Sequence, residues 1–227
     1  MKPKSLEVDF FGKIDKNFEK EFYNFSKTLN YKKGDSPFSV DNLLNYFYIV
    51  VDGRIKTYQL NFENAKEQTL FIYKRGDMFD VVSLLDGKSH EVIYEVMEDC
   101  RVLQFPVQKI RELLEFDSAF KNMFYTYLAS SIRYAENLAV ELSLYEVKDR
   151  LMKLLLENIN PNTRFRYKIL QNLSNSEISN ILGTVRHVVE RAIKQLKDEK
   201  IIKCSRKNIT VLNVHKLLEK STKLLHK

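Results

Sequence analysis

Basic side chains recur on one side of a short segment near the C-terminal end of the chain. Arg186, Arg191 and Lys194 are spaced so that a helix would place them on one face together with His187. A forked guanidinium donates paired hydrogen bonds to guanine edges and to phosphate oxygens, and a lysine binds phosphate as a point charge. The types and spacing of these side chains therefore indicate contact with a nucleic acid.

The segment that must position these side chains is residues 173–196, which reads as two short amphipathic helices hinged at Gly183. Ser174 followed by Glu177 is a capping box that starts the first helix, and glycine permits the left-handed backbone of a tight turn. The expected buried faces consist of Ile178, Ile181 and Leu182 in the first helix and of Val188, Val189, Ala192, Ile193 and Leu196 in the second. This pattern is typical of a helix-turn-helix. By itself it also fits a helical hairpin buried in an enzyme, with its arginines merely solvated.

The residues after this segment favour DNA over that alternative. Two short β-type runs, 201–204 and 209–212, flank a polar turn that carries Arg206 and Lys207 at its tip. They predict a small β-hairpin, or wing, whose two cations would lie near phosphates. A helix-turn-helix followed by a basic wing is more specific for DNA than either part alone.

The charge is divided unevenly along the chain. Residues 148–227 hold 18 Lys and Arg against 7 Asp and Glu, whereas residues 1–147 hold 19 against 23. Because neutralised phosphates supply most non-specific DNA affinity, the polyanion partner is expected to bind the C-terminal part.

Several other classes of protein are disfavoured. Two cysteines form no disulfide framework and cannot hold a four-cysteine iron–sulfur cluster within one chain. No apolar run has the length of a signal peptide or a membrane span, so we expect a cytoplasmic protein. The sequence contains no Gly-rich phosphate loop, no two-His helix motif, no Cys-x-x-Cys and no nucleophile elbow, so no enzyme is expected.

The N-terminal part mixes two periodicities. Aromatic and apolar residues spaced by three or four between Phe10 and Leu29 predict helices on a core. Short β-branched or aromatic runs follow, separated by turn signals such as Asp52–Gly53, and they predict an antiparallel sandwich, barrel or roll. The expected strands are 46–51, 54–60, 68–73, 91–96 and 101–105.

The helical period returns after Pro106. The sequence predicts a short helix over 107–116, a long one over about 117–146 without Gly or Pro, and a further helix over 147–159. A seven-residue repeat in the long helix predicts a parallel coiled-coil seam between two copies of the chain. The seam residues are Leu128, Ile132, Ala135, Ala139 and Leu142. A second stripe of Phe124, Leu138 and Tyr145 offers a face for the roll. A single helix packed within one monomer is the alternative.

In this order and size, the elements resemble the CRP/FNR family of bacterial transcription regulators over nearly the whole chain. The resemblance is carried by Asp52–Lys56, by Arg75–Phe79 and by a C-terminal set: Leu173, Glu177, Ile178, Gly183, Arg186, Val189, Arg191, Leu196 and Ile201–Ile202. It implies an α+β protein with three parts: a β-roll sensor of the cyclic-nucleotide-binding, cupin-like type with flanking helices (1–116), a dimerisation helix (117–147) and a winged helix-turn-helix (148–227).

The resemblance also assigns expected roles and partners. Arg186 and Arg191 would contact bases or phosphates, and Ser174, Ser176 and Thr184 would lie near backbone phosphates. Together with His187, Lys194, Arg206 and Lys207 they form the expected DNA-binding set. The expected partners are double-stranded DNA, a second copy of the chain and RNA polymerase. The competing function is a non-catalytic module whose basic domain binds RNA or an acidic protein.

This chain departs from the family pattern in three places. His187 stands where the best-known members carry a Glu that accepts from cytosine, so the preferred half-site should differ. The wing tip is basic where a Gly is common. The positions expected to hold a ribose-binding Glu and a phosphate-binding Arg are Val81 and Glu91, so cyclic AMP should not bind.

The effector is therefore left open by the sequence. Heme is one possibility, with His90 as the sensor-domain histidine that could ligate it, because some family members use heme to sense gases. A different small metabolite, or control by abundance with no ligand, are the alternatives. Val81, His90 and Glu91 mark the expected effector pocket.

Overall fold

The computed structural model describes residues 24–159, 170–205 and 208–225. The chain forms two compact units, the first made of residues 1–59 and 70–134 and the second of residues 60–69 and 135–227. Within the described ranges, none of the helices has both the length and the apolar character that crossing a bilayer requires.

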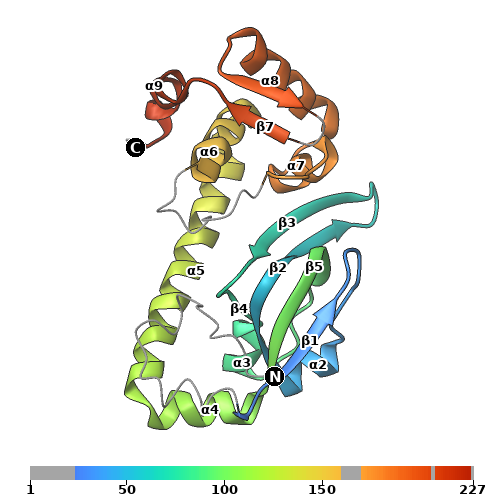
Figure 1. Ribbon diagram of the computed structural model, residues 1–227, viewed down its shortest axis with the longest axis vertical. Coiled ribbons are helices and arrows are strands. Elements are labelled where there is room, and N and C mark those ends of the chain that lie inside the picture. Colours follow the sequence, from blue (N-terminus) through green and yellow to red (C-terminus); the bar gives the residue numbers. More distant parts are fainter. Residues whose placement is uncertain (1–23, 160–169, 206–207, 226–227) are drawn as a thin grey trace, which may run out of the picture. The chain divides into compact units, whose positions relative to one another are not determined.

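An antiparallel sheet is the scaffold of the first unit (Figure 1). Its strands are β1 (Lys27–Tyr31), β2 (Tyr46–Asn61), β3 (Lys66–Tyr73), β4 (Met78–Phe79) and β5 (Ile93–Pro106). They are ordered β1-β5-β2-β3, and β4 pairs with β2. This arrangement confirms the antiparallel roll expected from the sequence.

Two expected strand breaks turn out to be irregularities within continuous strands. Asp52–Gly53 was expected to be a turn, but β2 runs through it with register shifts against β5 between Val50 and Ile55. Gly53 has a φ of 82°, and a Cβ there would lie 2.4 Å from the carbonyl oxygen of Asp99 on β5. Gly53 therefore allows β2 and β5 to approach each other closely at a β-bulge, and it does not form the turn of a hairpin. Likewise, β5 joins the expected strands 91–96 and 101–105 into one.

Alternate residues of β2 and β5 belong to two different apolar clusters. Phe47, Ile49 and Leu103 pack with residues of the following helices, whereas Tyr48, Val50 and Val102 face a largely aromatic cluster inside the roll. Successive side chains of a strand point to opposite faces. Because both faces are buried, these strands read as nearly continuous apolar runs.

Three helices were missed by the sequence analysis, and the helical period expected up to Leu29 was wrong at its end. The missed helices are α2 (Val40–Asn45), α3 (Val81–Asp86) and the C-terminal α9 (Val214–Leu225). The helical stripe expected to reach Leu29 is replaced at 27–31 by β1, which pairs with β5 from Lys27↔Gln104 to Tyr31↔Cys100. Pairing with a strand so distant in sequence overrides the local period. The earlier part of that stripe, residues 1–23, lies outside the described residues.

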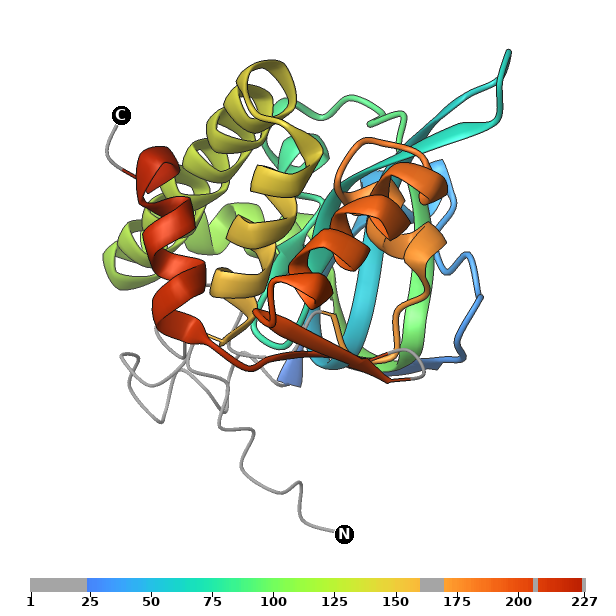
Figure 2. The ribbon, with the colours of Figure 1, turned by 90° about the horizontal axis from the view of Figure 1, so that it is seen from above.

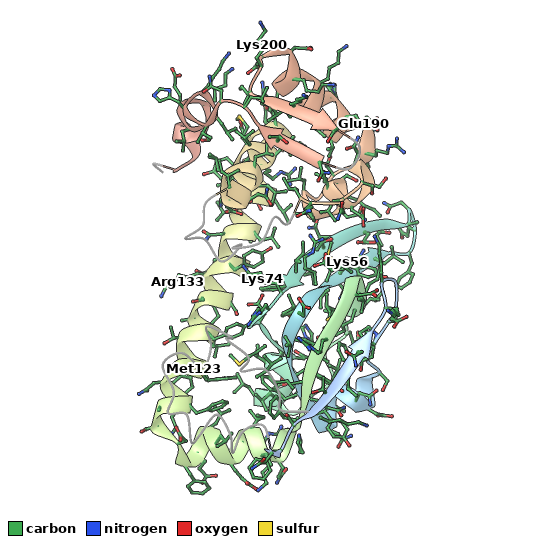
Figure 3. The ribbon with its side chains drawn as sticks, in the orientation of Figure 1. Lys56, Lys74, Met123, Arg133, Glu190 and Lys200 are labelled. Atoms are coloured by element: carbon green, nitrogen blue, oxygen red, sulfur yellow. The ribbon has the colours of Figure 1, made fainter. Side chains whose placement is uncertain are left out.

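The expected helices after Pro106 are confirmed as α4 (Val107–Phe116), α5 (Ser118–Leu144) and α6 (Val147–Ile159). Phe120 and Phe124 of α5 are fully buried in the cluster that includes Phe47 and Ile49, and the Tyr127 hydroxyl donates to the carbonyl oxygen of Met78 at 2.9 Å. Met123 points from α5 toward the strands, whereas Arg133 points away from them (Figure 3). The first half of α5 is thus an integral part of the roll.

The second unit contains the end of α5 from Ala135 onward together with α6, α7 (Asn175–Ile181), α8 (Arg186–Asp198), β6 (Ile202–Ser205), β7 (Asn208–Val211) and α9. Strands β6 and β7 pair antiparallel from Ile202↔Val211 to Ser205↔Asn208. Helix α6 lies beside both α8 and α9 (Figure 2). These elements confirm the helix-turn-helix and the β-hairpin predicted from the sequence.

Candidate nucleic-acid interface

The first helix of the motif starts with the capping box that the sequence predicts. The Ser174 side chain accepts from the backbone N–H of Glu177 at 3.2 Å, and the Glu177 carboxylate accepts from the backbone N–H of Ser174 at 2.6 Å. Two otherwise unpaired donors at the helix start are satisfied. Ile178 and Leu182 are buried and Ile181 is half-buried, so the first helix presents the expected face to the interior.

The turn between α7 and α8 depends on Gly183. Its φ is 63°, in the left-handed region that other residues enter at a cost. The backbone N–H of Thr184 then donates to the carbonyl oxygen of Ser179 at 2.9 Å, and α8 begins at Arg186. This short connection fixes the direction in which α8 leaves α7.

Helix α8 divides into an apolar and a polar side. Val189, Ala192, Ile193 and Leu196 are buried, and Val188 is half-buried. The side chains of Arg186, His187, Arg191 and Lys194 are exposed. The structure thus brings the four basic residues named from the sequence onto the exposed side of one helix, available to a polyanion.

Arg186 does not stand free on this helix. Its Nε donates to Oε1 of Glu190 at 2.7 Å, although the side chains of Arg186 and Glu190 are 67% and 42% exposed. The same Oε1 accepts from the Asn175 side-chain amide at 3.4 Å. The hydrogen bonds from Arg186 and then Asn175 hold the pKa of Glu190 below its usual value. The sequence places Glu190 on the exposed side of this helix, but neither Glu190 nor Asn175 was in the expected DNA-binding set, although an Arg–Glu pair four residues apart is a recognisable helical signal.

The remaining residues of the expected DNA-binding set are placed less uniformly. Ser176 is exposed near the start of α7, whereas Ser174 and Thr184 are half-buried. The Ser174 hydroxyl already caps α7. Arg206 and Lys207 lie outside the described residues, between β6 and β7.

A cluster of lysines converges on the end of α8. Glu199 is the C-cap of that helix, and its carboxylate pairs with Lys148 of α6 at 2.9 Å and with Lys220 of α9 at 2.8 Å. These bonds, that of Lys220 before that of Lys148, hold the pKa of Glu199 below its usual value. Lys216 of α9 also donates to the Glu199 carbonyl oxygen at 3.0 Å. Glu199 therefore ties the end of α8 to the start of α6, a role that its sequence position did not reveal.

Helix α5 is joined to α6 by a similar contact, since Glu141 and Lys153 form an ion pair.

Elsewhere along α5, apolar side chains are left uncovered in the single chain. Ile132 is 53% exposed, Leu142, Ala135 and Ala139 are also exposed, and Leu128 is half-buried. The five seam residues named from the sequence thus offer a stripe of accessible apolar surface.

The roll interior is occupied by the chain's own aromatic rings. The ring centroid of Phe38 lies 4.4 Å from that of Tyr48, 5.0 Å from that of Phe79 and 5.4 Å from that of Tyr94. Of the expected pocket residues, Val81 packs against apolar neighbours and Glu91 is exposed. Val81 replaces the ribose-binding Glu and Glu91 replaces the phosphate-binding Arg that the resemblance implies, so these two positions offer a cyclic nucleotide neither of those contacts.

His90, the third expected pocket residue, is engaged by a carboxylate. Its Nδ1 lies 3.0 Å from Oδ1 of the buried Asp80, the N-cap of α3. That hydrogen bond raises the pKa of His90. Burial raises the pKa of Asp80, but its bonds with His90, Ser83 and Val82 outweigh burial and hold it below its usual value. Among the described residues, no three His, Cys, Asp or Glu side chains are grouped to hold a metal ion.

Comparisons with known proteins match both parts of the chain. The family model of the cyclic nucleotide-binding domain matches residues 28–117, and that of the Crp-like helix-turn-helix domain matches residues 149–220. The two segments contain the roll with α4 and the whole helix-turn-helix with its wing.

Proteins similar over most of the chain are named as regulators. The chain is 24% identical over 188 residues to the global nitrogen regulator of Synechococcus elongatus, covering 81% of this chain and 84% of the relative. It is 23% identical to the fumarate and nitrate reduction regulatory protein of Vibrio cholerae, covering 83% and 76%. A solved transcriptional regulator of the CRP/FNR family from Thermus thermophilus has the same fold, with a TM-score of 0.70, 21% identity and coverage of 86% and 98%.

Proposed function

Because the chain belongs to the CRP/FNR family of transcription regulators, which are not enzymes, we propose that it acts on DNA as a homodimer. In this proposal each α8 enters one major groove of a roughly palindromic site. The half-site centres lie about one helical turn, ~34 Å, apart. The exposed row of Arg186, His187, Arg191 and Lys194 on a helix that is buried on its other side is the observation that supports this function most directly.

The proposed dimer uses the apolar stripe of α5. A second copy would cover Ile132, Leu142 and the small side chains between them, which single-chain packing leaves exposed. Small residues at Ala135 and Ala139 would allow the two helices to approach closely. Two parallel copies of α5 would present two DNA-binding units together, as a palindromic site requires.

We further propose that the roll is a sensor for something other than cyclic AMP. The polar groups buried in the roll include Asp80, which bonds to His90, and the Tyr94 hydroxyl, which has no hydrogen-bond partner in the described part of the chain. A small effector reaching them would act on α3 and β5. Heme with His90 as a ligand and a small metabolite are both compatible with these groups, and the absorption spectrum of the protein as purified separates them.

A route from α5 to the recognition helix is part of the same proposal. Helix α5 bonds to α6 through Glu141 and Lys153, and α6 bonds to the end of α8 through Lys148 and Glu199. A change in the seam or in the roll would therefore reach α8 through ion pairs and packed helices. Acting on chromosomal DNA, the protein would work in the cytoplasm and beside RNA polymerase.

The function is tested by selecting preferred duplexes from a random pool with the full-length protein. We expect an enriched, roughly palindromic sequence that binds two chains, with an affinity that falls steeply with salt. Enrichment of single-stranded RNA from a parallel pool, with no preferred duplex, would instead support the competing RNA-binding module.

A further inference from the structure

On the exposed side of α8, one carboxylate lies among the cations. Glu190 is one helical turn after Arg186, and its Oε1 receives the Nε–H of that arginine at 2.7 Å. The neighbouring exposed side chains on this helix are His187, Arg191 and Lys194. Figure 3 marks Glu190 on α8. The negative charge of Glu190 repels DNA phosphates, so any contribution of this residue to DNA recognition must come from its bond with Arg186.

The bond determines which edge of the guanidinium is available. Arginine has five N–H donors in a rigid fork, and it can present either of two donor pairs to a guanine. With Nε committed to Glu190, the pair that includes Nε is blocked. The two terminal nitrogens stay available for O6 and N7 of guanine, which accept a bidentate contact.

The carboxylate is itself held in place from the first helix. The Asn175 amide donates to the same Oε1 at 3.4 Å, a long bond that links the start of α7 to α8. The bonds from Arg186 and Asn175 keep the pKa of Glu190 low, so the group stays ionised. Arg186 is thus positioned by a pair of residues from two helices, and less conformational freedom is lost when it meets a base.

We propose that Glu190 is a positioning and specificity residue: it orients Arg186 for end-on contact with one guanine and weakens attachment to DNA of other sequence. The first effect raises affinity for the preferred site. The second lowers affinity for random DNA through repulsion between the carboxylate and phosphates. Specificity is the difference between these affinities, so both effects increase it. This inference rests on the proposed function, because it takes α8 to be the element that reads DNA.

The two effects have opposite signs, which a purely structural role would not produce. In Glu190→Ala we expect discrimination between the preferred duplex and one altered at a single base pair to fall by about tenfold. We expect affinity for a random duplex to rise by roughly threefold, since one repelling charge is removed. Glu190→Gln keeps an oxygen that can accept from Arg186, so it should retain more discrimination while still binding random DNA more tightly.

Asp198→Asn is the matched control. It also removes one exposed carboxylate from α8, but at the opposite end of the helix from Arg186. We expect it to leave base discrimination unchanged. If Glu190→Ala had the same effect on discrimination as Asp198→Asn, the proposal would be overturned.

A double-mutant cycle separates positioning from direct reading. If Glu190 acts through Arg186, then Glu190→Ala added to Arg186→Ala should cause no further loss of discrimination. A further loss or a change of preferred base in that background would show that Glu190 reads a base itself, and the positioning role would be wrong. Failure of the wild-type protein to prefer any duplex would instead overturn the proposed function, and circular dichroism of each variant verifies folding.

Discussion

Arg186 is the side chain whose loss should reveal how α8 is used. It is exposed at the first turn of the helix, and its Nε donates to Glu190. Arg186→Ala should cost about 1–3 kcal/mol of discrimination at one base pair of the preferred site. Binding isotherms on duplexes altered at each position in turn check this.

Lys207→Ala provides the contrast to that variant. Lys207 is expected at the tip of the wing, where a lysine would contact phosphate and carry no sequence information. Its loss should weaken all duplexes alike and reduce the slope of log affinity against log salt by about one. Equal loss of specific and random binding in Arg186→Ala would contradict the base-reading role of Arg186.

The His90–Asp80 pair predicts how stability of the first unit depends on pH. The hydrogen bond that His90 donates to the Asp80 carboxylate raises the pKa of His90 above 6.5, so the folded state favours the protonated ring. This stabilisation is fully present below pH 6.5, the pKa of His90 in the unfolded chain. It is lost as the pH rises through the higher pKa that His90 has in the folded protein.

The effect on stability is measured by thermal unfolding of wild type and His90→Gln at pH values below and above the two pKa values of His90. The melting temperature of wild type should fall relative to that of the variant as the pH rises. His215→Gln, which changes an exposed histidine of α9, serves as the control and should track wild type. Parallel pH curves for wild type and His90→Gln would contradict the assigned bond.

At the scale of elements, the helices of the DNA-binding unit were predictable because their signals are local. The capping box at Ser174, the glycine at the turn and the apolar stripe of α8 act within a few residues of sequence. The strands were less predictable. Whether Asp52–Gly53 turns or bulges, and whether residues 27–31 form a strand, depends on pairing with β5, far along the chain. Glu199 was missed for the same reason, since its partners come from α6 and α9.

The apolar side of α8 should determine the stability of the second unit. Leu196 is fully buried, so Leu196→Ala leaves a cavity and should lower the free energy of unfolding by about 2–5 kcal/mol. Leu212→Ala makes the same truncation at an exposed position just after β7 and should have little effect. Urea unfolding followed by far-UV circular dichroism compares the two, and equal midpoints would show that α8 is not packed as described.

At the scale of the whole molecule, the central question is whether two chains act together. Ile132→Glu places a charge in the proposed seam of α5 at a position exposed in the single chain, so folding should survive. The dimer dissociation constant should rise by about a hundredfold or more, because an unpaired carboxylate would be buried. Asn137→Glu adds the same charge at an exposed position outside the seam and should leave the dimer intact. Sedimentation equilibrium distinguishes these results, and an unchanged dimer in Ile132→Glu would rule out this seam.

Methylation interference at guanine N7 on the selected duplex tests the account most directly, because that atom lies in the major groove. We predict two symmetric patches of interference whose centres lie about one helical turn apart. In Arg186→Ala, the interference at the guanines that Arg186 contacts should be lost. A single patch, or interference confined to the minor groove side at adenines, would contradict the placement of paired α8 helices in successive major grooves.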